Sequence, residues 1–560
     1  MTLPTLLANR LWIRSSAGMY RAFRAALARP RAVQESYLLG LLARNAETEY
    51  GRRFGFAGIR SVEAYRARVP ATEYEDYEPS IERIAAGGRS VLTADDVRLF
   101  EPTSGTSSGT KFIPYTRALR SEFENGIAPW IVSLFAERPR LAATRSYWSI
   151  SPAGATPRSL GRVRVGFEDD SAYLGRIGRW VARRAMAVPP SVARIADPDE
   201  FRRLTLVHLL GARDLGIVSV WSPTFLTILL DFFLWNADEV LSLLAGEQPR
   251  RAAEIGSLFR AAGKGVFERI WPRLSLVSCW TDGPCRRYAE AIRDYLPHVE
   301  IQGKGLIATE AFVSFPLSPF PDPVLAITSH FFEFEDAASG STFLADEIRE
   351  GEEYSVVVTT GGGLYRYRLH DRVIVTGWIE RTPTLRFVGK DNRVADLFGE
   401  KLALPHVENC ISRACSALGI SPGFRLLAPD ESPLGGTSYT LYVEGVGLAP
   451  GAGRDLASAL DSLLKENFHY DHARRLSQLG PVRVFLIDGG PVGPAETYTA
   501  EMARRGLRLG DIKPSALDDR PGWSRLFRGG YVGDQPGGSA GRGPQTPPGE
   551  NRHWDEAVEP

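Results

Sequence analysis

A run of nine residues, 103–111, concentrates groups that bind phosphate, because it reads TSGTSSGTK. Glycine lets a backbone bend tightly and approach a ligand, while hydroxyls and amides donate hydrogen bonds. A lysine at the end of the run adds a compact positive charge. This combination suits a polyphosphate. The candidate phosphate contacts are Ser104, Gly105, Thr106, Ser107 and Lys111.

The nearest rival is the Walker A loop, G-x-x-x-x-G-K-[ST] between a strand and a helix. Here the two glycines are one residue too close, the lysine does not follow its glycine directly, and Phe112 replaces the Ser or Thr. Residues 97–100 and 112–115 both read as strands, and Thr116 is a suitable N-cap for the next helix. The sequence therefore predicts a loop between two strands. The alternative is a polar surface loop that binds nothing.

A second cluster, residues 303–310, reads GKGLIATE. Its first six residues fit the loose dinucleotide pattern G-x-G-x-x-[GA], but that pattern requires a following helix, and residues 312–316 read as extended. Thr309 and Glu310 are more informative, because a carboxylate beside a phosphate loop can hold magnesium. Glu310 is the candidate metal ligand.

Three further motifs each supply one charged group. Asp371 follows the segment LYRYRLH, and an aspartate at a strand end can accept hydrogen bonds from both ribose hydroxyls. The alternative for this segment is a salt-bridged surface strand. Lys390 lies in FVGKDN, residues 387–392, and Lys513 lies in GDIKP, residues 510–514.

Lysine is rare in this chain, with seven lysines among 67 basic residues. Arginine evidently serves wherever any cation will do, so the remaining lysines are candidates for positions that need a compact ammonium group. Four of the seven lie in the motifs above: Lys111, Lys304, Lys390 and Lys513. A fifth, Lys401, ends the segment FGEK, residues 398–401, into which residues 387–392 lead.

The elements that must position these groups are those of an α/β protein. At 560 residues the chain should form more than one domain, and 44% hydrophobic and 24% charged residues are ordinary for a globular protein. A net charge of +1 gives no case for a nucleic-acid partner. Helical patterns dominate residues 1–90 and recur at 119–140 and 198–212, while apolar runs typical of buried strands follow from residue 274.

No membrane span is expected, because Ser222, Pro223 and Asp231 interrupt the most apolar window, residues 215–235. A buried strand, a turn and a helix explain that window. The N-terminus is basic, and we expect an amphipathic helix that packs on the domain, with a targeting peptide or peripheral membrane contact as the alternatives. The arginines that precede the first acid are Arg10, Arg14, Arg21, Arg24, Arg29 and Arg31.

The four cysteines lack C-x-x-C spacing, which argues against a zinc site and indicates a reducing compartment, the cytoplasm. They are Cys279, Cys285, Cys410 and Cys415.

A change in the pattern of predicted strands and helices near Gly389 suggests a domain boundary. We expect a large N-terminal domain over 1–388, a smaller α+β domain over 389–528, and a disordered tail over 529–560 that is rich in Gly, Pro, Gln and Ser.

Taken together, the motifs resemble those of the adenylate-forming superfamily, whose phosphate loop reads roughly T-S-G-T-[ST]-G-x-P-K. A threonine-glutamate pair, an aspartate after a Y-R segment, a glycine-basic-x-aspartate hinge and a late lysine follow in the same order. More closely, roughly residues 15–520 resemble a bacterial-type member of the auxin-responsive Gretchen Hagen family of acyl acid–amido synthetases, including segments 45–52 and 74–77. Ser108 and Thr110 stand where the superfamily usually has Gly and Pro, and Lys390 where arginine is commoner.

The resemblance implies a large luciferase-like domain, a small mobile C-terminal domain, and the cofactors ATP and Mg²⁺. A carboxylic acid would be adenylated and its acyl group passed to an amine or amino acid. The phosphate loop would then hold the β- and γ-phosphates, Thr309 would lie near the α-phosphate, and Asp371 would bind the ribose. Lys513 would act at the α-phosphate, and residues 389–391 would form the hinge.

Aromatic side chains near the centre of the chain are candidates for the wall of an acyl pocket, with ordinary core packing as the alternative. They are Trp221, Phe225 and Trp280.

Two other functions remain open. One is an acyl-CoA ligase, which shares the first step but uses a thiol acceptor, and the other is a non-catalytic nucleotide-binding scaffold.

Overall fold

The protein was analysed as a computed structural model. The structure describes residues 3–104, 110–148, 158–166, 180, 184–195, 197–262, 265–282, 285–336, 339–390, 394–395, 397, 400–431, 437–444, 451–475, 478–505, 507 and 512–532.

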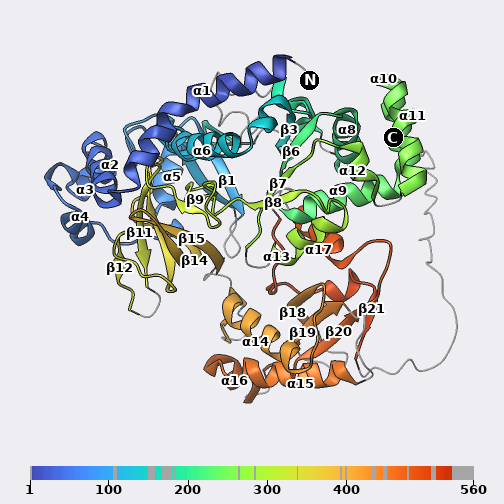
Figure 1. Ribbon diagram of the computed structural model, residues 1–560. Coiled ribbons are helices and arrows are strands. Elements are labelled where there is room, and N and C mark those ends of the chain that lie inside the picture. Colours follow the sequence, from blue (N-terminus) through green and yellow to red (C-terminus); the bar gives the residue numbers. More distant parts are fainter. Residues whose placement is uncertain are drawn as a thin grey trace, which may run out of the picture.

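The N-terminal region is helical, as the sequence predicts. Its basic first helix, α1 (Leu3–Ala26), lies along α6 (Arg117–Glu137) (Figure 1). On the buried face of α1, the Asn9 side chain donates to the carbonyls of Ala142 and Thr144, at 3.0 and 3.2 Å. The helix therefore packs on the domain. The helices that follow are α2 (Pro30–Arg44), α3 (Glu49–Arg53), α4 (Val62–Arg68) and α5 (Glu78–Ala85).

A four-stranded sheet of order β2-β1-β5-β4 carries the predicted phosphate loop. Strands β1 (Leu99–Ser104) and β2 (Thr110–Tyr115) are antiparallel neighbours, so the loop does join strand to strand. The hydroxyl of Thr116 accepts from the backbone N–H of Leu119 at 3.1 Å and caps α6, as expected. The other two strands are β4 (Arg158–Leu160) and β5 (Val163–Val165).

A seven-stranded antiparallel sheet of order β12-β11-β13-β14-β15-β10-β9 lies beside it (Figure 1). Burial alternates along most of β14, as it must when one sheet face packs on the core. Of the apolar run at residues 324–328, only the first two residues form a strand. The strands are β9 (Ser314–Phe315), β10 (Val324–Leu325), β11 (Phe331–Glu335), β12 (Thr342–Phe343), β13 (Glu353–Thr359), β14 (Tyr367–Ile379) and β15 (Thr382–Lys390).

The third sheet is parallel, with strand order β3-β6-β7-β8. Its middle strands β6 (Leu215–Ser219) and β7 (Leu276–Cys279) are buried throughout, because helices cover them. The edge strands are β3 (Arg145–Trp148) and β8 (Glu300–Gly303). The associated helices are α8 (Pro198–Gly211), α9 (Pro223–Trp235), α10 (Ala237–Glu247), α11 (Pro249–Ala262), α12 (Val266–Ile270) and α13 (Arg286–Ala291).

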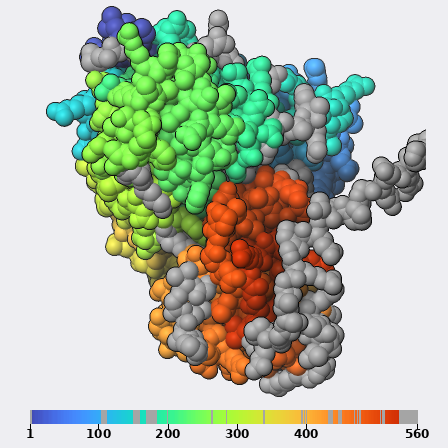
Figure 2. Space-filling model, turned by 90° about the vertical axis from the view of Figure 1, so that its right-hand side faces the viewer, coloured from blue at the N-terminus to red at the C-terminus, as the bar shows by residue number. Residues whose placement is uncertain are grey.

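The C-terminal residues form a separate sheet of order β18-β19-β20-β21 that packs on both faces. Alternate side chains of β19 enter different cores: Leu441 and Val443 enter one, and Tyr442 enters the other. In Figure 2 this orange and red part lies below, and in contact with, the green region of the chain. The elements are β16 (Val394–Ala395), β17 (Leu402–Ala403), α14 (Leu404–Ala417), β18 (Arg425–Glu431), β19 (Thr437–Glu444), α15 (Ala452–Leu464), α16 (Phe468–Arg475), β20 (Arg483–Ile487), α17 (Pro494–Arg504) and β21 (Gly529–Tyr531).

The predicted tail needs one correction. Residues 529–531, placed in the tail by composition, form strand β21 and pair with β20. Gly529 lets β21 lie close to its neighbour, because a Cβ at this position would meet the carbonyl oxygen of Leu486 at 1.9 Å. Residues 533–560 lie outside the described residues.

Among the described helices, none has the length and apolar character needed to cross a bilayer.

Candidate active site

Lys111 extends from β2 just after the phosphate loop. Its Nζ lies 5.3 Å from the ring centroid of Tyr74, and the Tyr74 hydroxyl accepts from the backbone N–H of Phe112 at 2.7 Å. Tyr74 thus holds β2 and the lysine side chain together. The predicted contacts Gly105, Thr106 and Ser107 lie outside the described residues, as does the side chain of Ser104.

Thr309 and Glu310 occupy the tip of a tight turn. The backbone N–H of Ala308 donates to the Ala311 carbonyl at 2.9 Å, and Ile307 bridges to Phe312. No helix follows this segment, which agrees with the rejection of a dinucleotide motif. The turn places the Glu310 carboxylate in a buried position, 9% exposed.

A buried pair fixes this turn to the rest of the site. The His330 ring accepts from the backbone N–H of Phe312 through Nε2 at 2.9 Å, and its Nδ1 lies 2.8 Å from the Glu122 carboxylate. The same carboxylate accepts from the backbone N–H of Gly361, ahead of β14. Glu122 and His330 therefore tie two motif-bearing segments to α6. Sequence reasoning missed both residues, because neither lies in a recognisable motif.

Asp371 and Lys390 face each other across β14 and β15. They are register partners, and the Lys390 Nζ lies 3.1 Å from the Asp371 Oδ1. Asp371 is 3% exposed, so this carboxylate is largely shielded from solvent. Two residues that are 19 positions apart in the chain thus form one ion pair.

Glu310, Asp371, Lys390 and Lys111 act on one another electrostatically. Burial raises the pKa of Glu310 above its usual value, and the nearby Asp371 adds to the rise, while Lys390 and Lys111 oppose it. Two carboxylates and two ammonium groups, drawn from four separate motifs, therefore share one small region. This is the grouping that the sequence predicted for a nucleotide site.

The donor groups of this site suit a magnesium ion that is bound mainly by its nucleotide. In the part of the chain that the structure describes, no three His, Cys, Asp or Glu side chains cluster as a metal cage. Mg²⁺ that arrives with a nucleotide needs only one or two carboxylates, since phosphate oxygens and water supply the remaining ligands. A buried carboxylate whose pKa is raised by desolvation gains from a nearby cation. Glu310 therefore fits the role of a single carboxylate ligand.

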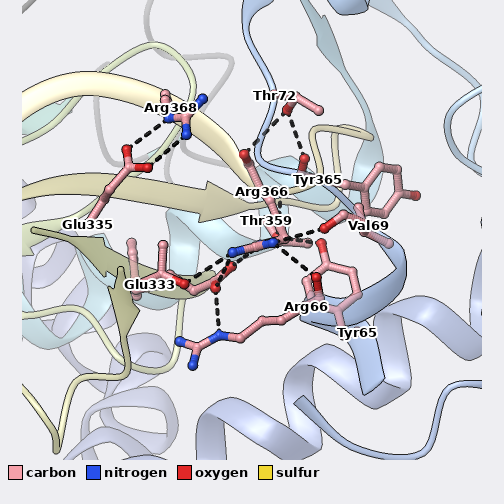
Figure 3. Close-up of polar contacts among 12 residues, drawn as sticks. Tyr65, Arg66, Val69, Thr72, Glu333, Glu335, Thr359, Tyr365, Arg366 and Arg368 are labelled. Carbon is pink, nitrogen blue, oxygen red and sulfur yellow. Dashed lines mark hydrogen bonds and ion pairs between the residues drawn. The ribbon is translucent and has the colours of Figure 1, made fainter. Parts of the chain in front are cut away.

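The segment before Asp371 is held by a buried ion-pair network (Figure 3). Arg366 donates to both oxygens of Glu333, at 3.0 and 3.1 Å, and to the Val69 carbonyl at 2.9 Å. Arg66 donates to the same glutamate at 2.8 Å. Arg366 also adopts a left-handed φ of 50°, which its contacts must maintain. The alternative of a surface salt bridge describes the half-exposed Arg368 but not Arg366.

Lys513 comes from the C-terminal part and reaches the N-terminal part. Its Nζ lies 3.9 Å from the ring centroid of Trp280, which follows β7, and 5.4 Å from that of Phe387 on β15. Ile512, its neighbour, is buried in the C-terminal core and anchors the backbone. The late lysine thus lies at the contact between the two parts of the chain.

The three candidate acyl-pocket residues are not equivalent in the structure. Trp221 and Trp280 pack together, with ring centroids 5.8 Å apart, at the carboxyl ends of the parallel strands. Phe225 lies on α9, is 7% exposed, and packs 6.3 Å from Phe201 in the core. The structure brings Trp280 next to both Lys513 and Trp221, whereas Phe225 belongs to the hydrophobic core.

The whole architecture matches solved structures of one class. The chain superposes on a structure described as AtGH3.15 acyl acid amido synthetase in complex with 2,4-DB, with a TM-score of 0.75 at 18% identity, over 90% of this chain and 94% of that one. A second structure, GH3.15 acyl acid amido synthetase, gives a TM-score of 0.72 over 88% of this chain and 92% of its own. The fold is the α/β adenylate-forming fold expected from the sequence.

Residues 19–301 match the GH3 family N-terminal domain, and residues 323–390 match the GH3 family central domain. The chain belongs to the GH3 family, as its motifs indicated. It is 27% identical to indole-3-acetic acid-amido synthetase GH3.8 of Oryza sativa subsp. indica, over 69% of this chain and 71% of that protein. It is 25% identical to indole-3-acetic acid-amido synthetase GH3.17 of Arabidopsis thaliana, over 68% of this chain and 72% of that protein.

Proposed function

We propose that this chain is an ATP-dependent acyl acid–amido synthetase. In the first step, a carboxylate oxygen attacks the α-phosphorus of ATP and pyrophosphate leaves, which gives an acyl-adenylate. In the second step, an amine or amino acid attacks the activated carbonyl, loses a proton, and releases AMP. Family membership and the amido synthetases among its relatives support this reaction.

One observation carries the proposal: Lys111, Glu310, Asp371 and Lys390 interact within one region. Reactions at phosphorus depend on placement and charge stabilisation more than on covalent help from the protein. We assign Lys111 and the loop residues Ser104, Gly105, Thr106 and Ser107 to the β- and γ-phosphates. Asp371 accepts from the ribose hydroxyls, and Lys390 holds that carboxylate in place.

Glu310 would hold the magnesium of MgATP, with Thr309 beside the α-phosphate. When bound, the metal would neutralise charge on the phosphates and orient the leaving pyrophosphate. This chain contributes the Glu310 carboxylate. Its turn is held in place by the hydrogen bonds of His330 to Phe312 and to Glu122.

We assign Lys513 to the α-phosphate and the reacting carboxylate, where an ammonium group stabilises charge that develops in the transition state. The proposed division is a large domain over 1–388 and a small mobile domain over 389–528, joined at a hinge of residues 389–391. Lys513 would then enter the site with the small domain. Its contact with Trp280 and Phe387 supports this assignment.

The acyl group would lie against Trp221 and Trp280, with Phe225 supporting them from the core. Aromatic walls favour an aromatic or apolar acid. Because Lys513 lies over Trp280, an acid held against the two tryptophans would present its carboxylate beside that lysine.

Acid-dependent exchange of pyrophosphate into ATP, measured across a broad panel of acids, tests the first step. Mass spectrometry of products made with mixed amino acids or with CoA tests the second. Amides are expected. A thioester product would show an acyl-CoA ligase instead, and an absence of exchange with every acid would favour a nucleotide-binding scaffold.

A cytoplasmic location is proposed from the cysteines, because all four are buried and none forms a disulfide.

Peripheral membrane contact through α1 is compatible with this location. Three leucines, spaced four residues apart along the helix, are exposed: Leu3, Leu7 and Leu11, at 63, 53 and 42%. Flotation with anionic vesicles tests this contact, and Leu7→Glu should abolish any flotation.

A further inference from the structure

A buried lysine lies at the carboxyl ends of the parallel strands and takes no part in the chemistry proposed above. Lys304 directly follows β8, and its backbone N–H donates to the Cys279 carbonyl at 3.1 Å. The residue is only 3% exposed. An ammonium group removed from water is costly unless a partner compensates it, so this position needs an explanation.

Aromatic rings surround the amino group. Its Nζ lies 5.0 Å from the ring centroid of Trp221, 5.1 Å from that of Trp130 and 5.7 Å from that of Trp148. These faces attract a cation but offer no oxygen acceptor. The one hydrogen bond goes to the Ser219 hydroxyl, at 2.5 Å. Of the three N–H donors of an ammonium group, one therefore has an oxygen partner among the residues that the structure describes.

Burial also makes this lysine easy to deprotonate. Desolvation lowers the pKa of Lys304 from 10.5 to about 7, and the nearby Cys279 opposes the shift. Near neutral pH the group is therefore divided between amine and ammonium. An anion placed beside it would raise the pKa and draw a proton from solvent.

The position of Lys304 relates it to the acyl site. Trp221, above which its amino group lies, packs against Trp280, and the Nζ of Lys513 lies 3.9 Å from the Trp280 ring. Two indole rings thus connect Lys304 to the lysine that we assign to the reacting carboxylate. An acid lying along these rings would bring its far end towards Lys304.

We propose that Lys304 is a specificity-determining residue, which binds an oxygen carried by the acid substrate at the end remote from the carboxylate that is adenylated. The substrate class is an acid with a ring or short chain between its carboxylate and a second oxygen, and a second carboxylate is the best match. A site built to donate hydrogen bonds rejects analogues that lack the acceptor, since its buried donors are then left unpaired. This inference rests on the proposed adenylation activity.

The test compares matched acids in pyrophosphate exchange: hexanoate with adipate, and benzoate with 4-hydroxybenzoate and 1,4-benzenedicarboxylate. In at least one set, the wild-type kcat/KM should favour the acid with the second oxygen by about tenfold or more. Lys304→Met should remove this preference and leave the KM for ATP unchanged. The control is Lys465→Met, which removes an exposed lysine paired with Asp461 in the C-terminal part and should keep the wild-type preference.

An unchanged preference in folded Lys304→Met, or a wild-type preference for the plain acid in every set, would overturn the inference. An absence of exchange with any acid would contradict the proposed function instead.

A second measurement does not depend on the variant folding. Calorimetric titration of the preferred acid at pH 7.5, in two buffers with different ionisation enthalpies, should show uptake of a fraction of a proton. The uptake should vanish below about pH 6, where a group with a pKa of about 7 is already protonated. Zero uptake at pH 7.5 would overturn the inference.

Discussion

At the scale of single residues, the site depends on charged groups whose surroundings differ. Asp371 is buried and paired with Lys390, so its carboxylate is fixed before any ligand arrives. Lys513 instead lies over an aromatic ring and reaches the site from another part of the chain. Replacing each residue should therefore impair a different property: ATP binding for Asp371, and the rate of adenylation for Lys513.

Lys513→Ala should reduce acid-dependent pyrophosphate exchange by about 100- to 1000-fold, the cost of removing one group that stabilises transition-state charge. ATP binding, measured by titration calorimetry, should change little, because Lys513 is assigned to the developing charge. Lys465→Ala is the matched control and should exchange normally. Near-normal pyrophosphate exchange by Lys513→Ala would contradict the assignment of Lys513 to the α-phosphate.

Asp371→Asn should weaken ATP binding by about tenfold or more, since a hydrogen bond to a charged group is worth about 1.5–3 kcal/mol. The sharper readout is sugar discrimination. Wild-type protein should bind ATP more tightly than 2′-deoxyATP, and the variant should lose most of that difference. Equal discrimination by the two proteins would rule out a ribose contact.

At the scale of elements, β14 is positioned by the network that precedes it. Arg366 joins β14 to β11 through Glu333 and to the end of α4 through the Val69 carbonyl. The network fixes where β14 begins, at Tyr367, and hence where Asp371 lies four residues later. Arg366 is thus a positioning residue, and we expect its replacement to lower the stability of the fold.

Arg366→Met should lower the free energy of unfolding by about 3–5 kcal/mol, because Glu333 is 1% exposed and would lose one of its two arginines. Arg368→Met is the control. Its pair with Glu335 is partly exposed, so its loss should cost about 0.2–1 kcal/mol. Urea titration followed by tryptophan fluorescence compares the two variants, and similar costs would contradict the burial argument.

At the scale of the whole molecule, the proposed mechanism requires the C-terminal part to bring Lys513 to the N-terminal part. The contact of Lys513 with Trp280 and Phe387 fits the arrangement that we propose for adenylation. An amine must reach the same acyl carbonyl afterwards, so we expect the small domain to rotate about residues 389–391 between the two steps.

Asp391→Pro should restrict this rotation, because proline fixes φ near −65°. Pyrophosphate exchange should fall by less than about threefold, while amide formation should fall by more than about tenfold. The control is Gly489→Ala, which lies in the C-terminal part outside the hinge; its added Cβ would meet nothing within 4 Å and should leave both steps intact. A parallel loss of both activities in Asp391→Pro would argue against a hinge.

Much of the fold was predictable because its signals are local. The strand-to-strand loop, the Thr116 cap, and the strand and helix at 215–235 follow from turn residues and apolar runs, and the structure confirms them. The strand at 529–531 was missed because two of its three residues are glycines. Glycine signals a loop in the sequence, but a close neighbour requires it here.

The sequence by itself determined the family, the order of the motifs, and the charged groups that an adenylation site needs, because these are properties of residue type and spacing. Only the tertiary structure decided which groups meet. It paired Asp371 with Lys390, buried Glu310 on a turn fixed by His330, and enclosed Lys304 in tryptophans from three separate segments. Burial and contact between distant segments set the pKa and the partners of a side chain, and neither can be seen in the residue alone.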